Sequence, residues 1–343
     1  MDRGTKDHSR QCWIIDSFAF PGKQGTGNPA AVVLLASETN PNDADTQQWM
    51  KSVAIEFNLS ETAFIWPCDR NDTHIQERND DDKLFHIRYY TCNGSEVDLC
   101  GHATLASASV VLHILGFGPG KKGVDAIFHA KHDILRTKVA PPISKISDSG
   151  CSAARIAMDF PWKDEHEITE VAKRSDVISM IKSAFHLRSD AGVLYVGIDC
   201  DEGDILVEVT QTLFLSLCDE EKVDFSHMVD LDGYNRGIIV CCKCTSKEED
   251  NNTKGGEKTK TDFDFISRFF GPKVGINEDP VTGSAHCVLG PYFGTKLGKL
   301  KLLGKQMSSR GGVVECTLKI DESTKRVGIV GTAVTFMSGT LHI

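Results

Sequence analysis

Apolar and polar positions follow the same order in two separate stretches of the chain: a strand-like run, a polar turn with a glycine, then a helix-like pattern. In the first stretch the turn contains Gly101, and apolar residues recur at helical spacing as far as Leu115. In the second the turn contains Gly283, and the stretch ends in the same Leu-Gly pair at Leu297. We expect Pro291 to kink or weaken the second helix. The repeated order predicts two related halves.

Further residues strengthen this repeat. A glutamate, Glu96 or Glu278, stands five positions before the glycine in each copy, and an Arg-aromatic-aromatic triplet begins upstream at Arg88 or Arg268. The N-terminus of a helix binds anions through its backbone N–H groups and the positive end of its dipole. Two such termini facing one another would hold a small carboxylate or zwitterion between the half-domains. The alternative is that both turns are ordinary helix caps with small residues for close packing.

Most of the remaining pattern predicts strands. Helices are predicted over 45–57 and 168–186, with a short one over 224–231. Residues 25–30 match the G-x-G-x-x-A fingerprint of dinucleotide sites, but a β-branched run follows where that fingerprint requires a helix, so we interpret them as a turn. Strands with one prominent helix per half favour an α+β protein of two half-barrels, each around a helix, over a doubly wound sheet.

The length and the distribution of turn-forming residues indicate two domains. A chain of 343 residues can bury two hydrophobic cores. A segment with prolines and serines near 141–152 predicts a boundary between an N-terminal half-domain over 12–140 and a C-terminal one over 150–343. The last strand is a candidate to pack on the first domain. The highly charged segment 246–261 cannot bury a core, and we expect a disordered surface insertion there.

Charge and cysteine content narrow the possible partners. The formal net charge of −10 and the lack of a basic stripe argue against nucleic-acid binding and against an anionic membrane surface. No apolar run is long enough to span a bilayer, and the first residues lack the apolar core of a signal peptide. The twelve cysteines then suggest reduced thiols in a cytoplasmic protein. The cysteines over 241–244 stand on a run predicted to be a buried strand, so no metal site is expected there.

Glu56 is a candidate for acid/base chemistry. At about 100° per residue it falls on the edge of the apolar stripe of the predicted helix over 45–57, next to Trp49 and Val53. Partial desolvation there would raise the pKa of the carboxyl group and suit it to proton transfer near neutral pH. The alternative is a carboxylate at the rim of the stripe whose stem covers apolar surface.

Four motifs in order resemble those of the PhzF-like isomerase family of phenazine biosynthesis. They are GNPAAV at 27–32, EFNLSETAF at 56–64, LCGHATL at 99–105 and EDPVTGSAH at 278–286. The resemblance covers about residues 12–340. It implies the diaminopimelate-epimerase-like fold, with two similar β-rich half-barrels that each hold a central helix and with the site in the cleft. It also implies a homodimer.

The resemblance also implies a reaction. The best-known member of this family isomerises a dihydro-hydroxyanthranilate by moving a proton, with no metal or organic cofactor. Carried over to this chain, the catalytic residues are Glu56 as acid/base, His102 and Asp279, and the substrate-binding residues are Asn28, Ser60, Gly101, Gly283 and Ser284. We therefore expect an isomerase that acts on a small anionic or zwitterionic metabolite without a cofactor.

Two alternatives remain at this point. Racemases of the same superfamily are similar but use two cysteines, one at each helix start. The two thiols remove and replace a Cα proton from opposite faces of the carbon. Cys100 stands at the first such place, but the matching place in the second half holds Pro280–Gly283, and Cys287 lies beyond the turn. The other alternative is a protein that binds a small ligand in the same cleft without turning it over.

Overall fold

The chain divides into two compact units. The computed structural model describes residues 9–21, 23–68, 80–116, 124–141, 153–201, 203–218, 223–245, 248–249, 260–320 and 325–342. Unit 1 comprises Met1–Asp159 and Val330–Ile343, and unit 2 comprises Phe160–Ile329. The chain passes from one unit to the other within two strands, β8 (Ala153–Pro161) and β19 (Lys325–Leu341). Most of the segment expected to link the domains, 142–152, lies outside the described residues.

The described part of unit 1 is rich in strands and holds two α-helices. Its elements are β1 (Arg10–Ser17), β2 (Asn28–Leu34), α1 (Ala44–Phe57), β3 (Glu61–Pro67), β4 (Lys83–Thr91), β5 (Glu96–Val97), α2 (Gly101–Ser109), the π-helical turn η2 (Val110–Ile114), β6 (Asp125–His129) and β7 (Ile134–Val139). α1 confirms the helix predicted over 45–57 and packs on β3 and β4. Its apolar side joins a core that includes Met50, Phe64 and Tyr90.

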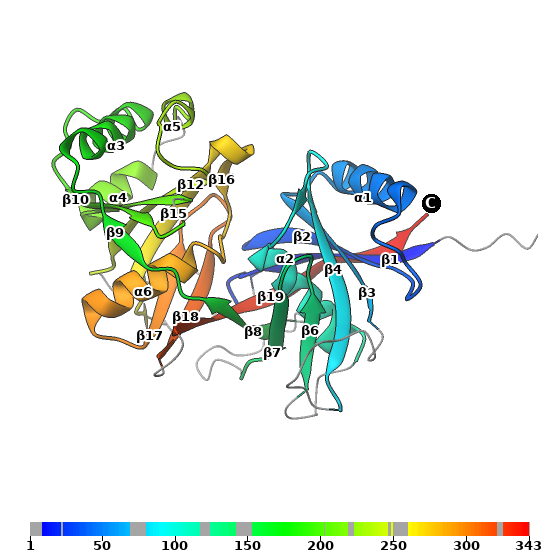
Figure 1. Ribbon diagram of the computed structural model, residues 1–343. Helices are drawn as coiled ribbons and strands as arrows, with labels where there is room; N and C mark the ends of the chain where they lie inside the picture. Colours follow the sequence, from blue (N-terminus) through cyan, green and yellow to red (C-terminus); the bar gives the residue numbers. More distant parts are fainter. Residues whose placement is uncertain are drawn as a thin grey trace, which may run out of the picture. The chain divides into compact units, whose positions relative to one another are not determined.

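α2 is the buried helix of unit 1. All nine of its residues are buried, and it packs on β1, β2, β3 and β7 (Figure 1). Its small side chains let the strands approach closely, and its hydroxyls bond back to the helix, with Thr104 Oγ1 donating to the Cys100 carbonyl at 2.7 Å. The helical run ends at Ile114, and Gly116 adopts a positive φ of 75°. The predicted stop at Leu115 and Gly116 is therefore confirmed.

Among the described residues, unit 2 has more helices than unit 1. Its elements are β9 (Glu165–Glu167), α3 (Val171–Ala184), β10 (Val193–Asp199), β11 (Asp204–Val209), α4 (Gln211–Cys218), α5 (Ser226–Val229), β12 (Gly237–Lys243), β13 (Glu248–Glu249), β14 (Lys260–Thr261), β15 (Phe265–Gly271), the 3-10 turn η3 (Pro272–Val274), β16 (Ile276–Asp279), α6 (His286–Leu297), β17 (Lys301–Gln306) and β18 (Gly312–Ile320). The two other predicted helices correspond to α3 and α5, whereas the sequence did not predict α4. One core cluster joins α3, α4 and α5 to the strands around Val207, Val240 and Phe270.

The strand pairing repeats between the units. In unit 1, β1 and β2 are antiparallel, β3 is parallel to β2, β4 is antiparallel to β3, and β6 is parallel to β4. In unit 2 the same order recurs: β10 and β11 are antiparallel, β12 is parallel to β11, β15 is antiparallel to β12, and β17 is parallel to β15. In each unit a short strand, β5 or β16, pairs with β4 or β15 just before the buried helix. The two units are thus built on one plan, as the repeat in the sequence predicted.

α6 continues past its proline. It runs without interruption through Pro291 from His286 to Leu297, so Pro291 does not end the helix, and the expected kink stays a prediction. Close packing explains the glycines within it: a Cβ on Gly294 would lie 2.3 Å from Cδ1 of Leu318 on β18. The glycines therefore serve the approach of helix and strand rather than breaking the helix.

Two further observations concern the charged insertion and the membrane. Within 246–261, predicted to be disordered, β13 and β14 form a short antiparallel pair, so the two described ends are ordered as strands. The rest of that segment, 246–247 and 250–259, lies outside the described residues. Among the helices described, none has both the length and the apolar character needed to cross a bilayer.

Candidate functional site

His102 is the centre of a buried polar cluster in unit 1. It is the second residue of α2 and is 5% exposed. Its Nδ1 lies 3.2 Å from Nδ2 of Asn28, and its Nε2 lies 3.3 Å from both Oγ of Ser60 and Oε2 of Glu61. Of the residues predicted from the sequence, the structure thus brings together Asn28, Ser60 and His102, with Gly101 at the start of the same helix.

The hydrogen bonds of this cluster fix the tautomer of the imidazole. Ser60 donates its hydroxyl hydrogen to Oδ1 of Asn28 at 3.4 Å, which leaves the Asn28 amide nitrogen to donate to Nδ1 of His102. Nδ1 is then an acceptor, so the hydrogen is on Nε2, the nitrogen that faces both Ser60 and Glu61. Burial lowers the pKa of His102, and the nearby Glu61 only partly offsets this. The imidazole is therefore neutral near pH 7.

Local structure explains why these residues meet. Asn28 begins β2 and Glu61 begins the parallel neighbour β3, so both side chains lie at the same end of adjacent strands. The Ser17 hydroxyl donates to the His102 carbonyl at 2.7 Å and ties α2 to β1. Before Asn28, Gly27 has a φ of 79°, and a Cβ there would lie 2.4 Å from the Ser17 carbonyl oxygen, so this turn requires glycine.

The two glutamates of the second motif lie in different environments. Glu56 is in the last turn of α1 and is exposed, so the prediction of a partly desolvated carboxylate there is wrong. The helix ends at Asn58 in the left-handed region, and the chain then enters β3. Glu61, which the sequence analysis did not select, is 9% exposed and contacts His102. Its position beside Ser60, at the start of an apolar strand, was the signal that could have indicated it.

Glu61, Cys100 and His102 are close enough to suggest a metal site. The Cys100 sulfur lies 3.3 Å from Nδ1 of His102, Glu61 lies 3.3 Å from Nε2, and one ligand atom of each residue lies within 4.8 Å of the others. A thiol, an imidazole and a carboxylate are ligand types that Zn²⁺ accepts. The expectation of no metal site therefore stays a prediction.

In unit 2, the residues predicted from the sequence lie in one turn before α6. Asp279 is 6% exposed at the end of β16 and accepts a hydrogen bond of 2.5 Å from Oγ1 of Thr282. The buried amide of Gln306, at the end of β17, holds this turn: its nitrogen donates to the Asp279 carbonyl at 2.8 Å and its oxygen accepts from the Thr282 N–H at 2.9 Å. Gln306 was not predicted, because it lies far along the sequence from the turn it supports.

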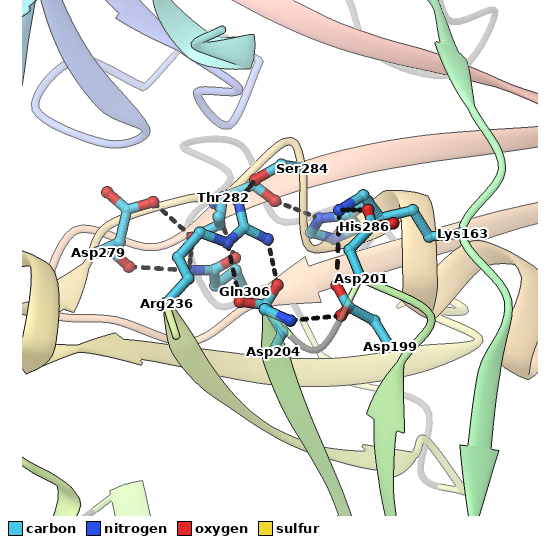
Figure 2. A network of polar contacts seen from close by, with 11 residues as sticks. Lys163, Asp199, Asp201, Asp204, Arg236, Asp279, Thr282, Ser284, His286 and Gln306 are labelled. Carbon is cyan, nitrogen blue, oxygen red and sulfur yellow. Dashed lines mark hydrogen bonds and ion pairs between the residues drawn. The ribbon is translucent and has the colours of Figure 1, made fainter. Parts of the chain in front are cut away.

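Gly283 and Ser284 follow in the same turn, and α6 begins two residues later at His286. Ser284 is half-buried and accepts a hydrogen bond from Arg236, which Figure 2 shows extended between Ser284 and Asp204. Nδ1 of His286 donates to the Thr282 carbonyl at 2.8 Å, and burial lowers the pKa of His286 to about 4. The expectation that this turn faces the Gly101 turn stays a prediction.

Comparison with known proteins identifies the family. The model of the PhzC-PhzF family, phenazine biosynthesis-like protein, matches residues 16–339. The chain belongs to this family. It is 36% identical over 336 residues to a protein of Halalkalibacterium halodurans named an uncharacterized isomerase, covering 96% of this chain and 97% of the relative. It is 34% identical to a bovine phenazine biosynthesis-like domain-containing protein, covering 96% and 98% of the two chains.

A solved structure supports the same assignment. The crystal structure of a PhzF-family protein of Enterococcus faecalis superposes with a TM-score of 0.68 at 28% identity, covering 98% of this chain and 100% of that one. The α+β class and the diaminopimelate-epimerase-like fold that the sequence motifs implied are therefore confirmed.

Proposed function

We propose that this PhzF-family protein is an isomerase that moves a proton on a small carboxylate- or amino-acid-like metabolite, with its own side chains as acid and base. The observation that carries the proposal is the buried Glu61 carboxylate beside Nε2 of His102. We propose Glu61, in place of Glu56, as the group that takes a proton from one carbon and returns it to another. Such a group must be shielded from water and held close to the carbon.

The state of His102 supports this role for Glu61. A neutral imidazole donates one hydrogen bond from Nε2 and orients the carboxylate without neutralising it, so the carboxylate keeps a charge with which to accept a proton. After proton transfer, Glu61 is a carboxylic acid and the substrate a delocalised anion. Returning the proton to a different carbon regenerates the carboxylate, and no atom is gained or lost.

The acids and hydroxyls of unit 2 fit the binding of the polar groups of such a metabolite. We propose Asp279 for contact with a substrate amine and Ser284 for contact with its carboxylate. A homodimer, a cytoplasmic location and independence of cofactors stay predictions that belong to the same proposal.

The two-thiol mechanism receives less support. Burial raises the pKa of Cys287 to about 12, so this thiol stays protonated near neutral pH and cannot act as a base. Cys100 lies beside the acceptor nitrogen of His102. Retention of activity by Cys100→Ala would remove this mechanism.

Exchange of solvent deuterium into a substrate tests the proposal. L-proline and L-aspartate would be incubated with the protein in deuterated buffer and followed by proton NMR. We expect exchange with the wild type, loss of at least about a hundredfold with Glu61→Gln, and wild-type exchange with Glu38→Gln, a matched change at an exposed loop residue.

Glu56→Gln distinguishes the two glutamates. Loss of exchange with Glu56→Gln and its retention with Glu61→Gln would overturn our assignment. Binding of these compounds without any exchange would instead support the non-catalytic alternative.

A further inference from the structure

The side chain of Arg236 makes hydrogen bonds to two residues of unit 2. Its Nε donates to Oδ1 of Asp204 at 2.8 Å, and its Nη2 donates to Oδ2 of the same carboxylate. Its Nη1 donates to Oγ of Ser284 at 2.7 Å (Figure 2). One guanidinium therefore links a buried acid to the hydroxyl of the turn before α6.

The strand arrangement holds Arg236 in place. β11 and β12 are parallel neighbours, with Asp204 opposite Gly237, so Arg236 just before β12 lies next to Asp204 at the start of β11. The Arg236 N–H also donates to the Gly203 carbonyl at 2.7 Å. Asp204 is 1% exposed, and a two-pronged contact between guanidinium and carboxylate restricts both side chains. The backbone hydrogen bond of Arg236 and the ion pair with Asp204 thus hold the guanidinium in place.

This fixed guanidinium determines the direction of the Ser284 hydroxyl. A guanidinium has only donors, so Ser284 Oγ must accept from Arg236 and its own hydrogen must point elsewhere. Within the described part of the chain, that hydrogen has no acceptor. The neighbouring hydroxyl of Thr282 differs, because it is engaged by Asp279. Ser284 is therefore the hydroxyl of this turn that remains available as a donor.

Each acid near Arg236 lies close to a cation, although Lys163 serves two of the three carboxylates. Lys163 lies 2.7 Å from Asp201 and 3.5 Å from Asp199, and Asp204 is paired with Arg236. Asp199 also accepts from the Gly203 N–H at 2.7 Å. Because each carboxylate has a positive partner, the cluster presents less repulsion to an incoming anion than three unpaired acids would.

We propose that Arg236 is a positioning residue that orients the Ser284 hydroxyl as a donor to a carboxylate group. The inference rests on the proposed function and extends it to the recognition of the substrate's acid group. By donating to its oxygen, Arg236 polarises the hydroxyl and makes it a stronger donor, which favours an anionic acceptor over a neutral one. Residue 236 thus sets the preference for a carboxylate without having to touch it.

Binding of benzoate, with neutral benzamide as its control, tests this role. The amide resonance of Ser284 would be followed by NMR on the full chain. We expect benzoate to bind the wild type at least about tenfold more tightly than benzamide, and Arg236→Lys and Ser284→Ala each to weaken benzoate binding about tenfold, as for loss of a hydrogen bond to a charged group. Lysine keeps the charge beside Asp204 but cannot form the fork and reach Ser284 together. Arg188→Lys, at an exposed position of the same unit, should change nothing.

The double variant separates positioning from a structural role. If Arg236 acts through Ser284, then Arg236→Lys/Ser284→Ala binds benzoate no more weakly than Ser284→Ala alone. Additive losses would show that Arg236 acts independently and would overturn the proposal, as would wild-type binding by Arg236→Lys or an absence of benzoate binding. If Arg236→Lys does not fold, the double variant Asp204→Asn/Arg236→Met is used in its place. This variant removes the guanidinium together with the buried carboxylate charge that it pairs with.

Benzoate binding and deuterium exchange separate a failure of this inference from a failure of the isomerase proposal. Benzoate binding that depends on Ser284, in a protein with no deuterium exchange, would overturn the isomerase and leave this inference intact. Deuterium exchange that depends on Glu61, together with benzoate binding that does not change on substitution of Arg236 or Ser284, would support the isomerase and overturn the role of Arg236.

Discussion

Arg268 and Glu278 form a two-pronged ion pair, with Nε 2.7 Å from Oε1 and Nη2 2.9 Å from Oε2. The corresponding residues of unit 1, Arg88 and Glu96, lie 3.4 Å apart. Both pairs join the strand of the Arg-aromatic-aromatic triplet to the short strand before the buried helix. The repeat seen in the sequence is thus a repeated contact, and it is tighter in unit 2.

Replacement of Arg268 should therefore cost more stability than replacement of Arg88. Arg268 is 6% exposed, and its guanidinium also lies 4.8 Å from the Phe270 ring centroid. We expect Arg268→Met to lower the free energy of unfolding by about 2 to 3 kcal/mol, because it removes a two-pronged ion pair made by a buried guanidinium and the hydrogen bond from that guanidinium to the Leu217 carbonyl. Arg88→Met is the matched control, with a loss of about 1 kcal/mol. Urea denaturation measures both, and equal losses would contradict the difference in geometry.

His286 makes stability depend on pH. Its pKa is about 4 in the folded protein because burial disfavours the charged ring, against about 6.5 in the unfolded chain. As the pH falls, the unfolded state therefore binds a proton at His286 before the folded state does. The contribution of the neutral His286 to the free energy of unfolding is complete above about pH 6.5 and decreases as the pH falls from about 6.5 to about 4. The loss amounts to about 3 kcal/mol. Thermal melts over this range should show a smaller slope for His286→Gln than for the wild type, and an unchanged slope for the exposed His132→Gln.

The tautomer of His102 can be observed directly. The hydrogen bonds from Ser60 through Asn28 place the imidazole hydrogen on Nε2. Nitrogen-15 chemical shifts should show this tautomer in the wild type. Asn28→Asp replaces a donor to Nδ1 by a carboxylate, which favours the charged ring, so the pKa of His102 should rise. If the wild-type ring carries its hydrogen on Nδ1, the donors and acceptors assigned to Ser60, Asn28 and His102 are wrong.

Gly294 should resist replacement even though alanine favours helices. A Cβ there would lie 2.3 Å from Cδ1 of Leu318 and 3.0 Å from the Lys299 carbonyl oxygen. We expect Gly294→Ala to destabilise the protein by about 1 to 2 kcal/mol, since overpacking outweighs the gain in helix propensity of about 1 kcal/mol. Calorimetric melts in the wild-type and Leu318→Ala backgrounds test the cause. The effect of Gly294→Ala should become smaller once Leu318 is shortened, while the contact with the Lys299 carbonyl oxygen remains, and an undiminished effect would point to the backbone instead.

The sequence by itself determined the repeat, the buried helix after Cys100 and the family. These features depend on local order: the alternation of strand and helix patterns, the small residues of α2 and four short motifs. It also indicated His102, Asn28 and Ser60, which the structure places in hydrogen-bond contact.

Only the tertiary structure decided which carboxylate lies beside His102. Glu56 and Glu61 are five positions apart in one motif, but α1 ends between them at Asn58, so one stays on an exposed helix turn and the other enters a buried strand. The contact between Arg236 and Ser284 likewise spans 48 positions and has no local pattern. Distant side chains meet through strand pairing and helix packing, which a motif does not encode.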